Sequence, residues 1–272
     1  MNAPRRLTDR PALDRHRERA RARAEDPFLH RLARDEAQDR LALVNRTFTK
    51  LAVVSPFPEL WDGTGARVVP DTEVLDLEPE AHDCVVHAMA LHWADDPVGQ
   101  LIQCRRALQP DGFMVAILPG GRSFQELRAV LAQAETELKG GLSPRVLPMA
   151  DIRDLGALLQ RAGMALPVAD SDTFTLTYRD LPHLAADLRA SGETNALEAR
   201  LRGATPRGLF ARAAELYGTI GATPDGRLAA TLELITLTGW APGPNQPQPL
   251  RPGSATERLA DALNTSETRL PD

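Results

Sequence analysis

The chain alternates between short, continuously apolar runs and longer stretches in which apolar residues recur at helical spacing. Four runs predict strands: Leu51–Val54, His82–Met89, Phe113–Leu118 and Leu228–Trp240. The second run is continuously apolar after Asp83, which is typical of a central strand in a parallel sheet. A β-rich stretch that includes Thr173–Tyr178 predicts one more strand.

Helix signals separate these strands. Helical patterns begin at Asp26-Pro27, at Asp96-Pro97 and at a capping box from Ser123 to Glu126. Further helices are predicted near residues 151–162, 181–190, 195–202 and 206–218. Alternating strands and helices predict an α/β fold with a doubly wound sheet, in which the strand after Asp83 is central and lies beside Phe113–Leu118.

The composition changes markedly at both ends of the chain. Between Arg5 and Arg23 there are eight arginines and three acidic residues, so residues 1–25 are interpreted as a flexible basic arm, with a docking arm for an acidic partner or RNA as the alternative. Residues 241–272 are polar and rich in proline, which predicts a disordered tail. The folded domain is therefore expected to span residues 26–240.

Charge, cysteine content and hydropathy exclude several classes of protein. The net charge of −5 and the lack of aromatic residues among the N-terminal arginines argue against a nucleic-acid partner. Two cysteines without metal-ligand spacing predict no metal site and a reducing compartment. No apolar run approaches the ~20 residues that span a bilayer, and no signal segment is present, so the expected location is cytoplasmic, without a membrane span.

Two groups of sequence strings resemble known families. DCVVHAMALHW and DPVGQLIQCRRALQPDGFMVAILPGG resemble the fourth strand, fourth helix and fifth strand of class I S-adenosylmethionine-dependent methyltransferases. The strings ELRAVLAQAETELKGGLSPR, LRASGETNAL and ATLELITLTGW resemble the methyltransferase-like assembly factors of respiratory complex I, whose mitochondrial member is described as hydroxylating an arginine of a core subunit. A more distant resemblance is to the carrier-protein methyltransferase of biotin synthesis.

The resemblance covers about residues 83 to 240 and implies a fold, a cofactor and a partner. The implied fold is a Rossmann-like class I methyltransferase sheet with a helical insertion after strand five. The implied cofactor is S-adenosylmethionine, and the implied partner is a protein client such as a complex I subunit.

The first half of the chain departs from this family pattern. The turn after the first strand, Ser55–Glu59, contains two prolines and no glycine, although glycine lets the backbone approach the cofactor. Only 27 residues separate Ser55 from Asp83, whereas three crossovers and two strands need about 45. One or two βα units are therefore expected to be missing, and binding of S-adenosylmethionine is in doubt.

Few residues remain for cofactor contacts in this shortened half. Asp76 is the best candidate for the acid that binds the cofactor ribose, and the alternative is an exposed turn acid. The resemblance also assigns Ser55, Ala88 and Leu91 to the cofactor.

The candidate catalytic and substrate-binding residues follow the predicted strands. His92 and Trp93 come just after the Asp83–Met89 strand, where ligands bind in open parallel sheets, and Trp93 alternatively fills the core. Glu135 ends a helix and could bind a substrate arginine, or it could simply face solvent. Gly141 and Arg145 lie in a glycine-containing loop suited to a lid. His92 and Glu135 are the catalytic candidates, while Trp93, Gly141 and Arg145 are the substrate-binding ones.

Three functions remain open. The chain could be an S-adenosylmethionine-dependent methyltransferase that modifies a complex I subunit, a non-catalytic assembly factor, or a protein-arginine hydroxylase. The missing glycine turn weighs against the first of these functions.

Overall fold

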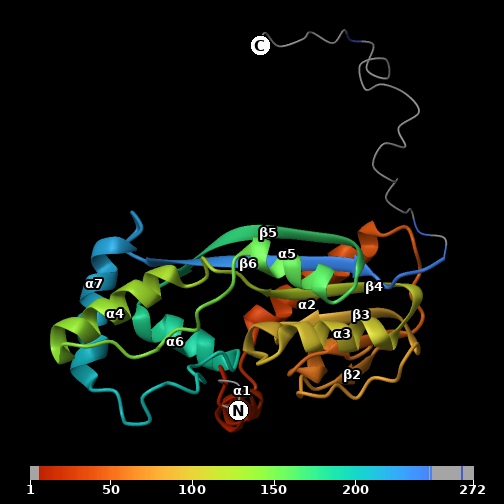
Figure 1. The fold of residues 1–272 in the computed structure, drawn as a ribbon. Helices are drawn as coiled ribbons and strands as arrows, with labels where there is room; N and C mark the ends of the chain where they lie inside the picture. The colour runs from red at the N-terminus through yellow and green to blue at the C-terminus, as the bar shows by residue number, and fades with distance from the viewer. Residues whose placement is uncertain (1–5, 245, 247–264, 266–272) are drawn as a thin grey trace, which may run out of the picture. The chain divides into compact units, whose positions relative to one another are not determined.

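The computed structural model describes residues 6–244, 246 and 265, which contain one mixed six-stranded sheet (Figure 1). Its strands are β1 (Leu51–Val54), β2 (Arg67–Val69), β3 (His82–Ala88), β4 (Leu108–Pro119), β5 (Ala165–Tyr178) and β6 (Leu228–Trp240). Their order is β2-β1-β3-β4-β6-β5. Strands β1 to β4 are parallel, and β6 runs antiparallel to both β4 and β5.

Helices cover both faces of this sheet. They are α1 (Arg10–Arg23), α2 (Phe28–Leu43), α3 (Pro97–Ala107), α4 (Gln125–Lys139), α5 (Ile152–Arg161), α6 (Leu181–Ala190) and α7 (Arg207–Ile220). One apolar core lies between the sheet and α2, α4, α6 and α7, and the other lies between the sheet and α3 and α5. Neighbouring residues of β3 illustrate the alternation, because Val85 packs in the second core and Val86 in the first.

The predicted α/β fold is confirmed. Strand β3 is central, its seven residues are all buried, and it pairs with β4 through Val86 and Val115. The structure extends the predicted Phe113–Leu118 strand to Leu108–Pro119 and the predicted Thr173–Tyr178 strand to Ala165–Tyr178. It also shows that β6 spans Leu228–Trp240, as the sequence predicts.

The segment between β1 and β3 is as short as expected. Within residues 55–81, all of which are described, there is one strand, β2, and one turn of 3-10 helix, Pro58–Trp61. Neither connection contains an α-helix. The carboxyl ends of β1 and β2 therefore lack the crossover helices that would otherwise flank them.

Two predicted features differ from the structure between Ser123 and residue 202. The side chains of Ser123 and Glu126 do not form a capping box, because Ser123 Oγ bonds to the backbone of Glu233 and Glu126 bonds to Thr231. Residues 195–202, predicted as a helix, form turns and a bridge between Leu197 and Thr8. In both places contacts with distant residues override the local pattern.

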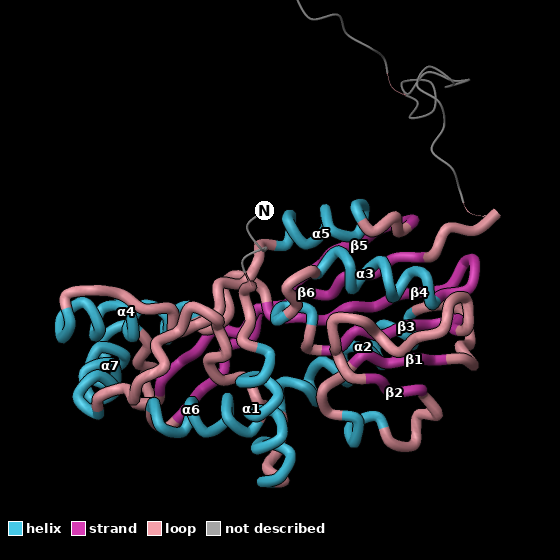
Figure 2. The backbone as a smooth tube through the Cα atoms, turned by 60° about the horizontal axis from the view of Figure 1, so that its bottom comes forward, coloured by secondary structure: helices cyan, strands magenta, loops and turns pink. Residues whose placement is uncertain are grey.

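The N-terminal segment also differs from the expected flexible arm. Residues 10–23 form α1, capped by Asp9, and Ala12, Leu13 and Ala20 are buried. Figure 2 shows α1 beside α6, at the same side of the molecule as β2. The disordered tail expected over residues 241–272 lies largely outside the described residues. Within the described part of the chain, no helix is long and apolar enough to cross a membrane.

Candidate functional site

Two cavities open where the parallel strands end. The first, here called the Trp93 cavity, has a volume of about 380 Å³ and is lined by Met89 after β3, Pro119 of β4, Trp93, and the loop Ser143–Leu147. The second, the Asp71 cavity, has a volume of about 360 Å³ and is lined by the ends of β1 and β2 and by α1. Open parallel sheets bind ligands at this edge, so both cavities are candidate sites.

Glu193, which follows α6, lines the Trp93 cavity. Its Oε2 accepts a 2.7 Å hydrogen bond from Trp93 Nε1 and lies 3.0 Å from His92 Nε2. Its Oε1 lies 3.5 Å from His30 Nε2 and makes no hydrogen bond within the described part of the chain. One oxygen of Glu193 is therefore buried beside His30 without a hydrogen-bond donor among the described residues.

The charge state of Glu193 follows from these neighbours. Burial by itself raises the pKa of the carboxyl, but the charge of His92 and the close contacts with His30 and His92 outweigh it and hold the pKa well below its usual value. Burial also lowers the pKa of His30, which favours its neutral form. The site thus presents an ionised carboxylate in mostly apolar surroundings.

Trp93 and His92 have different roles at this site. Trp93 is only 5% exposed and packs with Leu13 of α1 and with Leu197, so it fills a small core and lines the cavity at the same time. His92 is not among the residues that line the cavity, and its described polar contact is the one with Glu193. His92 therefore positions Glu193.

Glu135, the other expected catalytic residue, is buried and bound by residues of its own chain, so it does not face solvent. Arg145 donates to both of its oxygens, at 3.1 and 2.6 Å, and Ser143 donates through its backbone N–H and its hydroxyl. The Arg145 hydrogen bonds, followed by those of Ser143, lower the pKa of Glu135 to about 2. Glu135 thus fixes the loop that carries Arg145 to the cavity wall, while Gly141 is exposed.

The expected cofactor residues do not form one group. Ser55 lines the Asp71 cavity, and its hydroxyl accepts a hydrogen bond from Phe57 N. Ala88 and Leu91 are buried in the two different cores. Asp76 has a side chain that is 84% accessible and that pairs with Arg67. This position corresponds to the alternative interpretation, an exposed turn acid.

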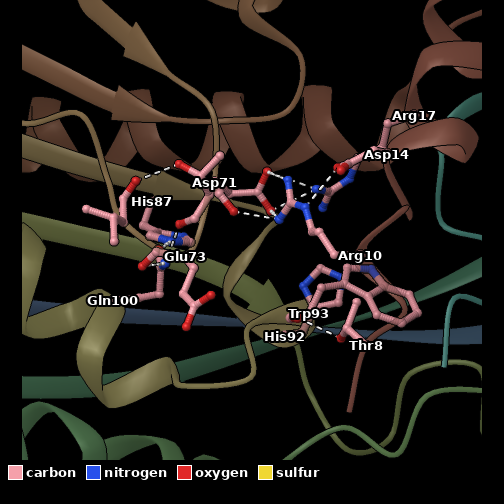
Figure 3. Close-up of polar contacts among 12 residues, drawn as sticks. Thr8, Arg10, Asp14, Arg17, Asp71, Glu73, His87, His92, Trp93 and Gln100 are labelled. Carbon is pink, nitrogen blue, oxygen red and sulfur yellow. Dashed lines mark hydrogen bonds and ion pairs between the residues drawn. The ribbon is translucent and has the colours of Figure 1, made fainter. Parts of the chain in front are cut away.

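The acid that does follow β2 is Asp71. It comes two residues after the strand and is buried beside Arg10 and Arg17 of α1 (Figure 3). A three-residue strand is too short to be recognised from its apolar pattern, so the sequence gives no clear signal for Asp71.

Glu193 and His30 are the other residues that sequence reasoning missed. Glu193 belongs to the string LRASGETNAL, which is part of the resemblance, but nothing local distinguishes it from an exposed turn acid. His30 lies in the predicted helix that starts at Asp26, and only the fold brings it to Glu193.

The acids Glu36, Asp170 and Asp172 also lie close enough together to hold a cation. Arg40 already bridges them, with hydrogen bonds to Glu36 and Asp170 and an ion pair with Asp172 at 3.8 Å. The guanidinium therefore already occupies the space between these acids and compensates part of their charge.

Comparison with known proteins finds methyltransferase-related sequences. Residues 36–116 match the family model described as a methyltransferase domain. The arginine-hydroxylase NDUFAF5, mitochondrial, of Rattus norvegicus is 34% identical over 202 residues, which is 74% of this chain and 59% of the relative. The malonyl-[acyl-carrier protein] O-methyltransferase of Xylella fastidiosa is 34% identical over 182 residues, 67% of this chain and 59% of the relative.

The chain carries a methyltransferase domain and is homologous to NDUFAF5. This methyltransferase-like chain spans about three fifths of the length of the relatives it matches. Among solved structures, YcgJ of Bacillus subtilis aligns with a TM-score of 0.48 at 11% identity, over 76% of this chain and 97% of that one. The Haemonchus contortus phosphoethanolamine N-methyltransferase 2, solved with S-adenosylhomocysteine, has a TM-score of 0.41 at 11% identity, over 76% of this chain and 53% of that one.

The residues of this methyltransferase-like chain do not fit S-adenosylmethionine at the ends of β1 and β2. Two prolines, Pro56 and Pro58, replace the glycine turn and offer no N–H donors. The acid after β2, Asp71, is already bound by two arginines.

Proposed function

We propose that the chain binds an arginine side chain of a protein client in the Trp93 cavity and acts in the assembly of respiratory complex I. The observation that carries this proposal is the buried carboxylate of Glu193, a residue that lines the cavity and whose Oε1 has no hydrogen-bond donor among the described residues. Its low pKa keeps it ionised, so it favours a cationic partner.

The apolar part of the cavity lining supports arginine over a compact cation. Leu127, Leu131, Leu188 and Leu232 are among its lining residues and provide an apolar wall for a methylene stem. A guanidinium is weakly hydrated and donates several hydrogen bonds in one plane, which suits a buried carboxylate. The rim includes the exposed side chains of Leu201 and Phe210, which suit contact with a folded client.

The homologues point the same way. The NDUFAF5 relatives are named arginine-hydroxylases, and the strings that contain Arg145 and Glu193 are among those that resemble the complex I assembly factors. Methyl transfer receives no support from the Asp71 cavity. The client is therefore proposed to be either held in place or hydroxylated at its arginine, and a complex I subunit is the proposed client.

A peptide comparison tests arginine binding. Fluorescence anisotropy would compare a peptide with a central arginine to the same peptide carrying citrulline, which has the same shape and no charge. We expect at least ~10-fold weaker binding of the citrulline peptide, because it lacks the charge-assisted hydrogen bonds. Equal affinity for the two peptides would refute the proposal.

Matched variants localise the effect. Glu193→Gln keeps the shape of the side chain and should abolish the preference for arginine, whereas Glu198→Gln, in a neighbouring exposed position, should leave it unchanged. Mass spectrometry of a co-expressed client would then separate hydroxylation, seen as one added oxygen on arginine, from simple holding.

A further inference from the structure

We infer that the N-terminal helix α1 permanently blocks the site of the cofactor nucleoside in this chain by engaging its acid, so that the protein works without S-adenosylmethionine. The juxtaposition behind this inference is Arg17 of α1 against Asp71, the acid at the carboxyl end of β2 (Figure 3). The inference concerns the Asp71 cavity and holds whether or not the Trp93 cavity binds arginine.

The position of Asp71 is that of a ribose-binding acid. It follows β2, which pairs with β1, and Ser55 at the end of β1 lines the same cavity. In doubly wound sheets an acid beyond the second strand accepts hydrogen bonds from ribose hydroxyls. Any nucleoside in this chain would therefore have to reach the Asp71 carboxylate.

Asp71 has no capacity left for a ribose. Arg17 Nη1 donates to both carboxylate oxygens, at 2.9 and 2.7 Å, and Arg10 donates to the same two oxygens at 3.1 Å each. Arg10 also donates to the Asp71 backbone carbonyl at 2.6 Å. Burial raises the pKa of Asp71, but the charges of Arg17 and Arg10 outweigh it and keep the pKa below its usual value. The carboxylate is therefore ionised and fully engaged.

The protein surface opposite Arg17 is fitted to this arginine. Gly192 has a φ of +68°, and a Cβ there would lie 2.9 Å from Arg17 Cγ and 3.1 Å from its Cα. Only glycine accommodates both the left-handed backbone and the close approach. Arg17, at 3% exposure, is thus enclosed by the segment after α6 as well as by Asp71.

The helix that carries Arg17 is anchored at its start. Asp9 N donates to Ala196 O at 2.8 Å, and the Asp9 side chain pairs with Arg200 and Arg202. Thr8 Oγ1 donates to the carbonyl of Trp93 at 2.7 Å. Leu13 is completely buried beside Trp93. Removing α1 from the Asp71 cavity would break all of these contacts, so α1 is an integral part of the fold.

Isothermal titration of the full chain with S-adenosylmethionine and S-adenosylhomocysteine gives the direct test. We expect no binding at concentrations up to about 1 mM, a level that corresponds to only ~4 kcal/mol of affinity. Saturable binding in the micromolar range would overturn the inference. This measurement needs no variant, so it does not depend on a substituted chain folding.

Chemical rescue tests whether Arg17 itself fills the space. Arg17→Ala should lower the thermal midpoint, and low-millimolar guanidinium, compared with equal sodium chloride, should raise it again by about 2–4 °C because the ion replaces the lost group beside Asp71. The matched control is Arg19→Ala, an exposed arginine of the same helix, which should neither lose stability nor respond to guanidinium. An unchanged midpoint in Arg17→Ala, or no specific rescue, would contradict the role assigned to Arg17.

Discussion

The edge of the sheet where the parallel strands end buries two carboxylates that differ in their hydrogen bonds. Asp71 lies at one end of this edge, here called the closed end, and Glu193 lies at the other, here called the open end. Asp71 faces two guanidinium groups, which stay charged at any relevant pH and occupy both oxygens. Glu193 faces an indole and two imidazoles, and one of its oxygens accepts no hydrogen bond among the described residues. A buried acid can serve a ligand only where its own protein partners leave part of its hydrogen-bonding capacity unused.

The largest effect is expected at the closed end. Asp71→Asn leaves Arg17 buried without a counter-charge, which costs about 3–5 kcal/mol of unfolding free energy because an unpaired buried ion is strongly disfavoured. Urea denaturation measures this loss. Asp76→Asn, at the exposed acid of the same connection, is the control and should change stability by no more than about 0.5 kcal/mol. Equal effects of the two variants would show that the Arg17 pair contributes little.

The two ends also differ in how well their residues can be predicted from the sequence. Continuous apolar runs and capping residues predicted β1, β3, β6 and the helix that begins after Asp96, because those signals are local. The family strings supplied Trp93 and the Arg145 loop. The closed end was missed because its determinants pair across long distances, with Arg17 meeting Asp71 54 residues away.

The arginine-rich segment shows the same limit. Its composition is typical of a solvated arm, but a helix can bury one face when only a few of its side chains pack against other elements. Ala12 and Leu13 provide that face, and Arg17 adds a buried ion pair. Similarly, Glu193 joins His92 and His30 only after the chain has brought α2, the end of β3 and the end of α6 together.

At the open end, Trp93 combines two roles that substitutions can separate. Trp93→Phe keeps an apolar wall but removes the hydrogen bond to Glu193, and we expect a loss of about 1.5–3 kcal/mol in unfolding free energy. Binding of the arginine peptide should fall only a few-fold, because Glu193 Oε1 does not depend on the indole. Trp61→Phe, at another buried tryptophan, measures the cost of the smaller ring alone. A Trp93→Phe loss no larger than that control would mean that the hydrogen bond is unimportant.

The loop over the open end depends on Glu135, and its contribution depends on pH. Glu135→Gln weakens the hydrogen bonds with Arg145 and should lower the free energy of unfolding by about 1–2 kcal/mol near neutral pH. The folded pKa of about 2 lies below that of an unfolded glutamate, so this contribution is present above about pH 4.5 and is lost as the pH falls toward 2. Denaturant titrations of both proteins across this range should converge at low pH.

The control for this prediction lies on the same helix. Glu137 pairs with Arg212 at a more exposed position, and Glu137→Gln should leave the free energy of unfolding nearly unchanged. If the difference between wild type and Glu135→Gln stays constant down to pH 2, Glu135 is not the titrating group in this range.

The smallest expected effect on stability distinguishes Gly140 from Gly141, the two glycines of the same loop. Gly140 ends α4 with a φ of +69°, so Gly140→Ala should cost about 1 kcal/mol from the left-handed backbone alone, since no atom lies within 4 Å of the added Cβ. Gly141 has neither a positive φ nor a close neighbour, and Gly141→Ala should leave stability within about 0.5 kcal/mol. Its effect on arginine-peptide affinity therefore reports client contact directly. Weaker binding at an unchanged thermal midpoint would show that Gly141 contacts the client. Unchanged binding would mean that the client contacts only the cavity walls formed by Trp93, Arg145 and Glu193.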